Sequence, residues 1–276
     1  MKQLKQRILN WTRNSDKQHK AKRLSTSLSD NQLYPQACLD AATNYELFNE
    51  FKRHPTYNRI LEHVSESQGQ EYLNIISNHP DMLEAIEKFK ENDKWGNPRV
   101  YDYTSVGSIS PTTLRYIKVL VDLRIYFQDL NDLEICEIGV GYGGQCRIIN
   151  AYFKLSNYCL VDIQPALALT QRFLDNFIID GSLSYQTMNE LAPKNYDLCI
   201  SNYAFTELPR TVQDVYLHKV ILNSTRGYIT YNEITPKRFN SYKADELVAT
   251  IPGAKILEEK PLTHPKNCII VWGDDF

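Results

Sequence analysis

Short apolar runs alternate with longer stretches of helical periodicity over the second half of the chain. The runs are nearly continuous in Val, Ile, Leu, Tyr and Cys and end near Gly, Pro, Asn or Asp, which is typical of buried strands. The stretches between them repeat their apolar residues with the period of a helix that buries one face. The predicted strands are residues 133–138, 158–163, 182–187, 196–201, 227–232, 255–259 and 268–272.

Helices are predicted in the intervals around these strands. They cover residues 165–177, 210–222 and 243–251, together with a stretch after Gly144 and a stretch that begins at Pro111. This βαβ order predicts an α/β protein with a doubly wound, mostly parallel sheet. The last two strands are expected to close the sheet as a hairpin. The pattern therefore predicts a Rossmann-like sheet of seven strands.

The N-terminal part of the chain has a different pattern. Residues 33–91 show helical periodicity without strand alternation, and Pro55 and Pro80 stand where new helices can begin. Residues 92–111 are rich in Gly, Pro, Asn and Ser and indicate an irregular loop that nevertheless keeps several aromatic residues. Such a loop is either a binding loop or a connector whose aromatic rings pack on the core.

The first 30 residues stand apart by their charge. They hold eight Lys or Arg against two Asp, whereas the whole chain has a formal net charge of -2. A basic leader suits a membrane surface or a glycosyltransferase partner, and a loosely ordered, solvated terminus is the alternative. We expect three regions: the leader at 1–30, a helical cap with a substrate loop at 31–110, and the sheet domain at 111–276.

Composition limits the class of protein. With 276 residues, 42% of them hydrophobic, the chain can bury a sizeable core. It has no apolar run of about 18 residues and no signal-peptide pattern, so a cytoplasmic protein is expected. Its six cysteines show no CxxC pairing and most lie in apolar runs, which indicates reduced core residues. No HxH, DxD or HExxH spacing occurs, and no metal site is predicted.

The stretch LEICEIGVGYGG at residues 133–144 carries the strongest chemical signal. A strand that ends in Gly139, Gly141 and Gly143 indicates a tight turn at which the backbone approaches a ligand. The glycines alone also fit the dinucleotide pattern. Glu137 favours a cationic ligand instead, such as the methionine moiety of S-adenosylmethionine with its ammonium group, because a carboxylate here would repel a pyrophosphate.

Asp162 marks a second position of the same ligand site. It lies at the end of the next predicted strand, about twenty residues beyond the glycine turn, where a carboxylate can accept both ribose hydroxyls of an adenosine ligand. The alternative is a helix-capping Asp before Pro165. The predicted cofactor-binding residues are Glu137, Gly139, Gly141, Gly143, Asp162, Ile163, Met188 and Asn202.

Four segments carry a resemblance to a known family: NDKWGNP at 92–98, GSISPTTLRYIKVL at 107–120, EIGVGYGGQ at 137–145 and SNYAFTEL at 201–208. Over roughly residues 55–235 the chain resembles the sugar O-methyltransferases of bacterial surface-polysaccharide gene clusters, which belong to the class I S-adenosylmethionine-dependent methyltransferases. The resemblance implies methyl transfer to a hydroxyl of a sugar carried on a nucleotide, a lipid or a growing glycan. It implies no nucleic-acid partner.

Methyl transfer to a hydroxyl requires an aligned acceptor oxygen and a group that takes its proton. The predicted catalytic residues follow strand ends or lie in the late hairpin, and they are Glu207, Tyr203, His264 and Glu233. A helix-capping role for Glu207 and a solvated loop position for His264 are the alternatives. The predicted substrate-binding residues are Tyr103, Ser110, Thr112 and Arg115.

Two of these substrate-side residues have further interpretations. The guanidinium of Arg115 suits an anionic group on the acceptor, such as a uronate or a phosphate, and an ordinary salt bridge is the alternative. Ser110 can also cap the helix that begins at Pro111.

Two rival functions follow from the same residues. A nicotinamide-dependent oxidoreductase would use the glycine turn, but Glu137 and the late hairpin count against it. A non-catalytic module would dock on a glycan-assembly complex or a membrane through its basic leader. The intact Glu137, glycines and Asp162 argue against a loss of cofactor binding.

Overall fold

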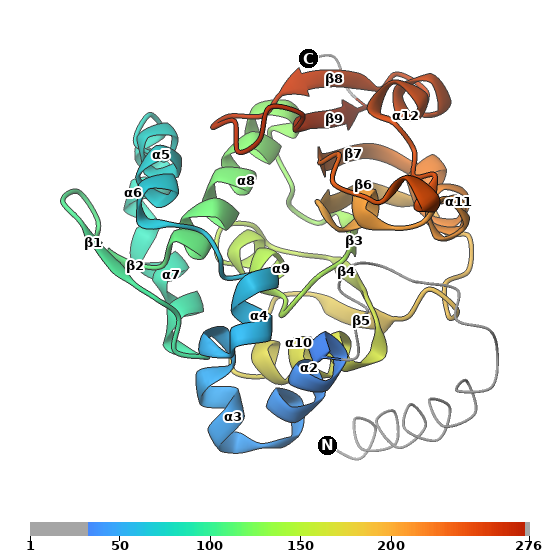
Figure 1. Cartoon of the computed structure of the whole chain (residues 1–276). Coiled ribbons are helices and arrows are strands. Elements are labelled where there is room, and N and C mark those ends of the chain that lie inside the picture. Colours follow the sequence, from blue (N-terminus) through green and yellow to red (C-terminus); the bar gives the residue numbers. More distant parts are fainter. Residues whose placement is uncertain (1–32, 274–276) are drawn as a thin grey trace.

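The computed structural model describes residues 33–273, so the predicted basic leader lies outside the described residues. Its centre is a sheet of seven strands in the order β5-β4-β3-β6-β7-β9-β8, stacked from bottom to top in Figure 1. Their bounds are β3 Glu134–Ile138, β4 Asn157–Val161, β5 Ser182–Gln186, β6 Tyr196–Asn202, β7 Ser224–Tyr231, β8 Lys255–Glu258 and β9 Cys268–Trp272. Every predicted strand is present, with ends shifted by up to three residues.

Strand direction follows the predicted scheme. The five strands β5, β4, β3, β6 and β7 pair in parallel, while β9 runs antiparallel to both β7 and β8. The strand order reverses between β3 and β6, because β3 pairs with both β4 and β6. In doubly wound sheets, ligands bind beyond the carboxyl ends of the strands at such a reversal.

Helices cover both faces of the sheet. Successive residues of β3 point to opposite faces, so Ile135 belongs to one core cluster while Cys136 and Ile138 belong to the other. The first cluster includes residues of α8 Pro111–Phe127, α9 Gly144–Asn150 and α10 Gln164–Leu174. The second includes residues of α11 Arg210–Lys219 and α12 Ala244–Thr250. The doubly wound α/β prediction is thereby confirmed.

The N-terminal region is helical, as the pattern predicted. It comprises α2 Leu33–Thr43, α3 Tyr45–Glu50, η2 Phe51–Arg53, α4 Pro55–Ile60, α5 Glu66–Ile76, α6 Pro80–Glu84, α7 Ile86–Lys90 and η3 Glu91–Lys94. Pro55 and Pro80 occupy the first helical positions that the sequence assigned to them. In this region α2 packs against α10 and α5 packs against α8, as Figure 1 shows along one side of the molecule. Its apolar side chains join the first core cluster of the sheet.

The stretch predicted as an irregular loop contains a small hairpin. Its strands β1 Tyr101–Tyr103 and β2 Gly107–Ile109 pair antiparallel, and Gly107 adopts a positive φ of 70° at the start of β2. Strands of three residues are too short for an alternating pattern to stand out in the sequence. The buried Tyr103 donates a hydrogen bond from its hydroxyl to the Glu66 carbonyl, which fixes the hairpin to α5.

Short 3-10 turns complete the C-terminal half: η4 Ala204–Glu207, η5 Ile221–Asn223 and η6 Lys237–Phe239. All six cysteines are free thiols, and five of them are buried, in agreement with the predicted reduced core residues. Within residues 33–273, no helix combines the length and the apolar character needed to span a bilayer.

Candidate functional site

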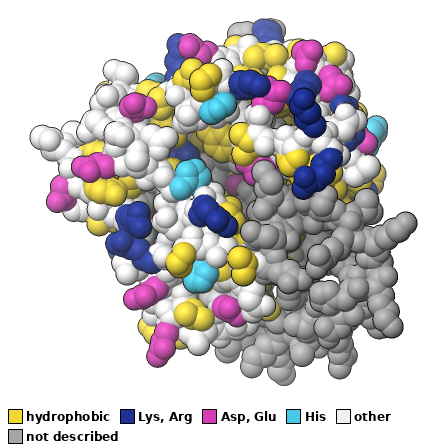
Figure 2. Space-filling view, in the orientation of Figure 1, with side chains coloured by type: hydrophobic (Ala, Val, Ile, Leu, Met, Phe, Trp, Pro, Cys, Tyr) yellow, Lys and Arg dark blue, Asp and Glu magenta, His cyan; other side chains and the backbone are white. Residues whose placement is uncertain are grey.

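A cavity of about 780 Å³ opens at the edge where the parallel strands end. Residues that directly follow β3, β4, β6 and β7 line it, namely Gly139, Asp162, Tyr203 and Asn232. Side chains from the N-terminal helices, from α8 and α11 and from the loop between β8 and β9 contribute to the rest of the wall. Figure 2 shows the hollow in the middle of one face, with an apolar floor and histidines at its edge. Its volume is in the usual range for small-molecule sites.

The glycine turn forms one side of this cavity. Gly139 and Gly141 have positive φ values of 80° and 58°, a backbone region that side chains disfavour. A Cβ on Gly139 would also lie 2.0 Å from the Cβ of Ala204, and one on Gly141 would lie 3.0 Å from Cδ1 of Leu61. The glycines are therefore required by the backbone and by close neighbours on the protein itself, in addition to any ligand.

Glu137 lies buried at the base of the cavity. The Tyr158 hydroxyl donates a hydrogen bond of 2.7 Å to its Oε2 atom. Burial raises the pKa of Glu137 to about 8, and the nearby charge of Asp162 acts in the same direction, while the Tyr158 hydrogen bond opposes both. A buried carboxylate that lacks a cation is costly, so this position favours a ligand that brings a positive charge.

Asp162 connects the glycine turn to the next strand. Its Oδ2 atom accepts the backbone N–H of Gly141 at 3.1 Å, and its Oδ1 atom accepts the N–H of Ile163 at 2.7 Å. The N-cap residue of α10 is Ile163, and no side chain caps this helix. The helix-capping alternative for Asp162 is therefore not what the structure shows. Asp162, Ile163 and Met188 all line the cavity, as the predicted cofactor site requires.

Asn202 ends β6 on the other side of the strand-order reversal. Its Oδ1 atom accepts a hydrogen bond of 3.2 Å from the Thr230 hydroxyl. Its Nδ2 atom is buried and has no hydrogen-bond partner among the described residues. Because buried donors are rarely left unpaired, this amide is suited to a ligand acceptor.

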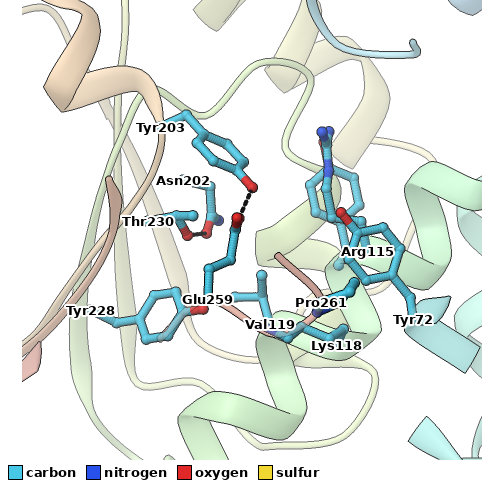
Figure 3. Close-up of a pocket in the computed structure, with 11 residues that line it drawn as sticks. Tyr72, Arg115, Lys118, Val119, Asn202, Tyr203, Tyr228, Thr230, Glu259 and Pro261 are labelled. Atoms are coloured by element: carbon cyan, nitrogen blue, oxygen red, sulfur yellow. Dashed lines mark hydrogen bonds between the residues drawn. The ribbon is translucent and has the colours of Figure 1, made fainter. Parts of the chain in front are cut away.

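Tyr203 has an unusual backbone and a fixed side chain. Its φ of 65° and ψ of -34° are rare for a bulky residue. Its N–H donates to the Thr230 carbonyl at 3.0 Å, which helps to hold this conformation. The Tyr203 hydroxyl donates to the carboxylate of Glu259, as Figure 3 shows. Burial, reinforced by the Glu259 charge, raises the pKa of Tyr203, so this phenol stays protonated.

Glu259 is a site residue that the sequence reasoning missed. It is almost fully buried, and its Oε2 atom accepts the Thr263 N–H at 2.9 Å and the Thr263 hydroxyl at 2.7 Å. The residue closes a predicted strand, which was a usable signal. However, β8 is an edge strand that pairs antiparallel with β9. The rule that ligands bind beyond the carboxyl ends of parallel strands does not cover such a strand.

Glu207 lines the cavity at the end of η4. The Asn232 amide donates a hydrogen bond of 2.8 Å to its Oε1 atom. Burial raises the pKa of Glu207, and the Asn232 bond opposes this only in part. A carboxylate with a raised pKa in a ligand cavity has the basicity that general-base catalysis requires. His264 also lines the cavity, although its side chain is exposed.

Arg115 projects into the cavity from the first turns of α8. Its Nη2 atom donates to the Leu61 carbonyl at 3.1 Å, and its guanidinium lies 5.6 Å from the centre of the Tyr116 ring. Arg115 lines a second, small cavity of about 20 Å³ as well, beside Tyr203 and Glu259. Figure 3 shows Arg115 and Tyr203 on opposite sides of this opening.

Five of the predicted site residues do not line the cavity, namely Glu233, Gly143, Tyr103, Ser110 and Thr112. Glu233 forms ion pairs with Lys243 and with Lys266, and these lysines lower its pKa. The structure therefore gives Glu233 neither the place nor the basicity predicted for it. Gly143 is the N-cap of α9, and a Cβ on it would lie 2.8 Å from Cγ2 of Thr170 on α10.

Ser110 and Thr112 hold α8 in place. Ser110 is the N-cap of α8, and its hydroxyl accepts the Thr113 N–H at 3.1 Å. The Ser110 N–H and hydroxyl both donate to Asp93, at 2.7 and 2.8 Å. Thr112 is buried and hydrogen bonds to Glu62. The capping interpretation of Ser110 is thus confirmed, while the placement of both residues at a substrate site is not what the structure shows.

Several cavity residues from the N-terminal helices were also missed, including Arg59, His63 and Tyr72. The sequence predicted a cap there, but helical periodicity does not indicate which turn reaches a cavity in another part of the chain. Among residues 33–273, no three His, Cys, Asp or Glu side chains are placed to share a metal ion.

Comparisons with known proteins found similar solved structures only at low identity. The sequence matches no family model and no curated protein. Magnesium protoporphyrin IX methyltransferase from Synechocystis PCC 6803, solved with SAM, is 15% identical over 58% of this chain and 83% of that chain, with a TM-score of 0.43. Thermoplasma acidophilum 1320 is 14% identical over 71% and 98%, with a TM-score of 0.42. A phosphoethanolamine N-methyltransferase of Haemonchus contortus is 15% identical over 51% and 38%, with a TM-score of 0.40.

The strand order itself defines the class of fold. Five parallel strands reverse their order between β3 and β6, and the antiparallel β9 lies between β7 and β8. This is the Rossmann-like sheet of the class I methyltransferases.

Proposed function

We propose that this protein is an S-adenosylmethionine-dependent methyltransferase that transfers the methyl group to a sugar hydroxyl. The observation that carries the proposal is the meeting of Glu137, the Gly139–Gly141 turn and Asp162 in one cavity at the strand-order reversal. The carboxylate of Glu137 suits the ammonium group at one end of this cofactor, and the carboxylate of Asp162 suits the ribose hydroxyls toward the other end.

The residues present fit the cofactor in further respects. Glu137 is buried without a cation, and the Asn202 amide is a buried donor without a partner among the described residues. Ile163 and Met188 offer apolar contacts to an aromatic base beside Asp162. When bound, the cofactor supplies an electrophilic methyl group on a positively charged sulfur.

The chain itself supplies a proton acceptor and groups that orient the substrate. We assign Glu207 as the general base, because it lines the cavity and burial raises its pKa. Tyr203, held by Glu259, is positioned to orient the acceptor hydroxyl by a hydrogen bond. His264 remains a proposed second contact at the exposed side of the cavity.

The sugar part of the proposal rests on the aromatic lining. Tyr72, Tyr116, Tyr203 and Tyr216 all line the cavity. Tyrosine rings stack on the apolar faces of sugars, and tyrosine hydroxyls bond to sugar oxygens. Together with the sequence resemblance, these rings favour a sugar of bacterial surface glycans as the acceptor.

Two measurements test this function. Titration calorimetry with S-adenosylhomocysteine and with NAD should show binding of the first alone. Radiolabelled methyl transfer to a pool of nucleotide sugars and glycan intermediates should then identify an acceptor. Binding of NAD alone would establish the oxidoreductase alternative. Binding of S-adenosylhomocysteine without transfer to any sugar would retain the cofactor and reject the sugar.

A further inference from the structure

The N-terminal helices present positively charged side chains to the cavity. Arg59 of α4 and His63, which follows α4, line it together with Arg115 of α8. Among the described residues, neither Arg59 nor Arg115 forms an ion pair with a carboxylate. The two arginines carry the positive charge, and the imidazole of His63, whose lowered pKa favours its neutral form, adds a polar group. We call these three residues the cationic wall.

The cationic wall keeps donor capacity for a ligand. Arg115 uses its Nη2 atom for the Leu61 carbonyl and also hydrogen bonds to the Tyr116 side chain. Because a guanidinium has five N–H groups, donors are left for another acceptor. Burial, together with the positive charge of Arg115, lowers the pKa of His63. The positive field at this wall is therefore felt by a neighbouring side chain.

The carboxyl group of Glu62 does not neutralise the cationic wall through a direct ion pair. Glu62 is buried, hydrogen bonds to Thr112 and interacts electrostatically with Arg115, but the two side chains form no direct ion pair among the described residues. Burial raises the pKa of Glu62, which disfavours its charged form. An unpaired arginine facing a cavity is typical of sites that bind carboxylate or phosphate groups.

The opposite side of the cavity is acidic. Glu137, Asp162 and Glu207 lie along the strand ends, where the proposed function assigns them to the cofactor and to the acceptor proton. The cavity is therefore polarised, with carboxylates at the sheet and cations at the helices. A ligand that matches it carries negative charge on the helical side.

Arg115 also lies near the place where the methyl acceptor is expected. Arg115 lines the small cavity beside Tyr203, Glu259 and Asn202, at the end of β6 where the acceptor hydroxyl is expected. The buried Nδ2 atom of Asn202 adds an unpaired donor at the same place. Figure 3 shows Arg115 and Tyr203 facing this space from two sides.

We propose that the methyl acceptor carries an anionic oxygen group, a phosphoryl or a carboxylate, and that Arg115 binds this group with Arg59 and His63 beside it. This inference rests on the proposed methyltransferase function and narrows its substrate class. A neutral sugar would leave Arg59 and Arg115 without an ion-pair partner among the described residues and the ligand.

The test is a titration with three matched probes: glucose 1-phosphate, glucuronate and uncharged glucose. Each is titrated by calorimetry into the ligand-free protein and into the protein saturated with S-adenosylhomocysteine. Saturation fills the site of the cofactor's own carboxylate, so any remaining preference for an anion belongs to the acceptor side. We expect at least one charged probe to bind the saturated protein at least tenfold more tightly than glucose. The charged probe that binds shows whether a phosphoryl or a carboxylate is preferred.

Variants assign the effect to the cationic wall. Arg115→Gln should weaken binding of the preferred charged probe at least tenfold. Arg59→Gln, at an exposed position that tolerates substitution, should weaken binding of the same probe severalfold. Both should bind S-adenosylhomocysteine within threefold of the wild-type protein. Arg99→Gln removes an exposed charge that does not line the cavity and is the matched control.

Each contrary result has a separate meaning. Equal binding of glucose and both charged probes overturns the anionic acceptor. So does a loss of S-adenosylhomocysteine binding in Arg115→Gln without a change in the anion preference, because the wall would then hold the cofactor. Failure of the wild-type protein to bind S-adenosylhomocysteine contradicts the proposed function instead. The probe titrations of the ligand-free protein and its variants then decide the anion site on their own.

Discussion

At the scale of single residues, Glu137 and Asp162, the two carboxyl groups of the proposed cofactor site, have different environments. Glu137 is buried without a cation, whereas Asp162 is half-buried and accepts two backbone N–H groups. In its charged form, Glu137 makes the ligand-free protein less stable, because no cation offsets its burial. Asp162 helps to fix the glycine turn, because it accepts the Gly141 N–H. The two residues should therefore respond differently to substitution.

Substitution of Asp162 should weaken cofactor binding. We expect Asp162→Asn to weaken binding of S-adenosylhomocysteine by about 1 to 3 kcal/mol, because hydrogen bonds to a charged acceptor are lost. Calorimetric titration measures this. Asp129→Asn is a matched control, since Asp129 also accepts a backbone N–H, that of Asn131, but lies outside the cavity. Unchanged affinity in Asp162→Asn would remove Asp162 from the site.

Glu137 gives a pH dependence with a definite sign. Its pKa of about 8 in the folded protein exceeds the ordinary value of 4.5, so the folded state holds the proton more tightly than the unfolded state between these values. The stability of the ligand-free protein should therefore fall as pH rises through this window, by at most about 1.4 kcal/mol per pH unit from this group.

Glu137→Gln tests this linkage. The variant should resist urea better than the wild-type protein at pH 8 and equally well near pH 4.5, because it carries no charge to bury. It should also bind S-adenosylhomocysteine more weakly at pH 8. A variant that is less stable than the wild-type protein at pH 8 would show that the charged form of Glu137 is already compensated.

Glu207 is the residue on which the chemistry depends in the proposed function. Glu207→Gln should lower methyl transfer at least tenfold, about 1.4 kcal/mol, with cofactor affinity within threefold, because only the proton acceptor is lost. The assay is radiolabelled transfer to an acceptor found in the nucleotide-sugar screen. Glu190→Gln is the control, since this exposed carboxylate bonds to Thr187 away from the cavity. Full activity of Glu207→Gln would show that another group accepts the proton, either the Tyr203–Glu259 pair or His264.

At the scale of elements, α8 shows how a sequence motif can be structural. Its first turn is tied to η3 through Asp93, which accepts hydrogen bonds from Ser110 and from the Thr113 hydroxyl. A carboxylate at this end also interacts favourably with the helix dipole. The same helix carries Arg115 into the cavity, so the cap positions a site residue that it does not touch.

Removal of this cap should cost stability and leave the ligand site intact. Ser110→Ala should lower the free energy of unfolding by about 1 to 2 kcal/mol in urea. Its affinity for S-adenosylhomocysteine should stay the same. Ser65→Ala, at the exposed cap of α5, is the comparison for an ordinary cap. A variant of Ser110 with normal stability but reduced methyl transfer would restore the substrate role predicted from the sequence.

The strands and the glycine turn were predictable because their signals are local. An apolar run, a following Gly and an Asp at the next strand end lie within a few residues of one another. The positions of Glu259 and Arg59 were not predictable, because they depend on how a late edge strand and an early helix pack near β6. Glu233 was wrongly placed for the same reason: its neighbour Asn232 faces the cavity, while Glu233 meets Lys243 and Lys266.

At the scale of the whole molecule, the N-terminal helices share the first core cluster with one face of the sheet and line the large cavity together with it. Leu61 lies against the glycine turn, and its carbonyl accepts the Arg115 guanidinium. Ligand binding at the sheet should therefore be felt in the helical region.

Hydrogen exchange measures this coupling. S-adenosylhomocysteine should slow amide exchange in residues 59–64 as well as in residues 139–141, because both segments contribute side chains or backbone to the cavity lining. Residues of α12 do not line the cavity and serve as the internal reference. Protection confined to the glycine turn would show that the helical region does not respond to the cofactor.

The contact between Leu61 and Gly141 also limits how this protein can be re-engineered. The segment that carries Arg59 and His63 is the one that covers the glycine turn. Grafting residues 33–110 from a relative with another acceptor would change the turn's packing partner along with the acceptor contacts. Exchange of acceptor preference should therefore succeed through single substitutions at Arg59 or His63, with Leu61 kept, and not through replacement of the region as a block.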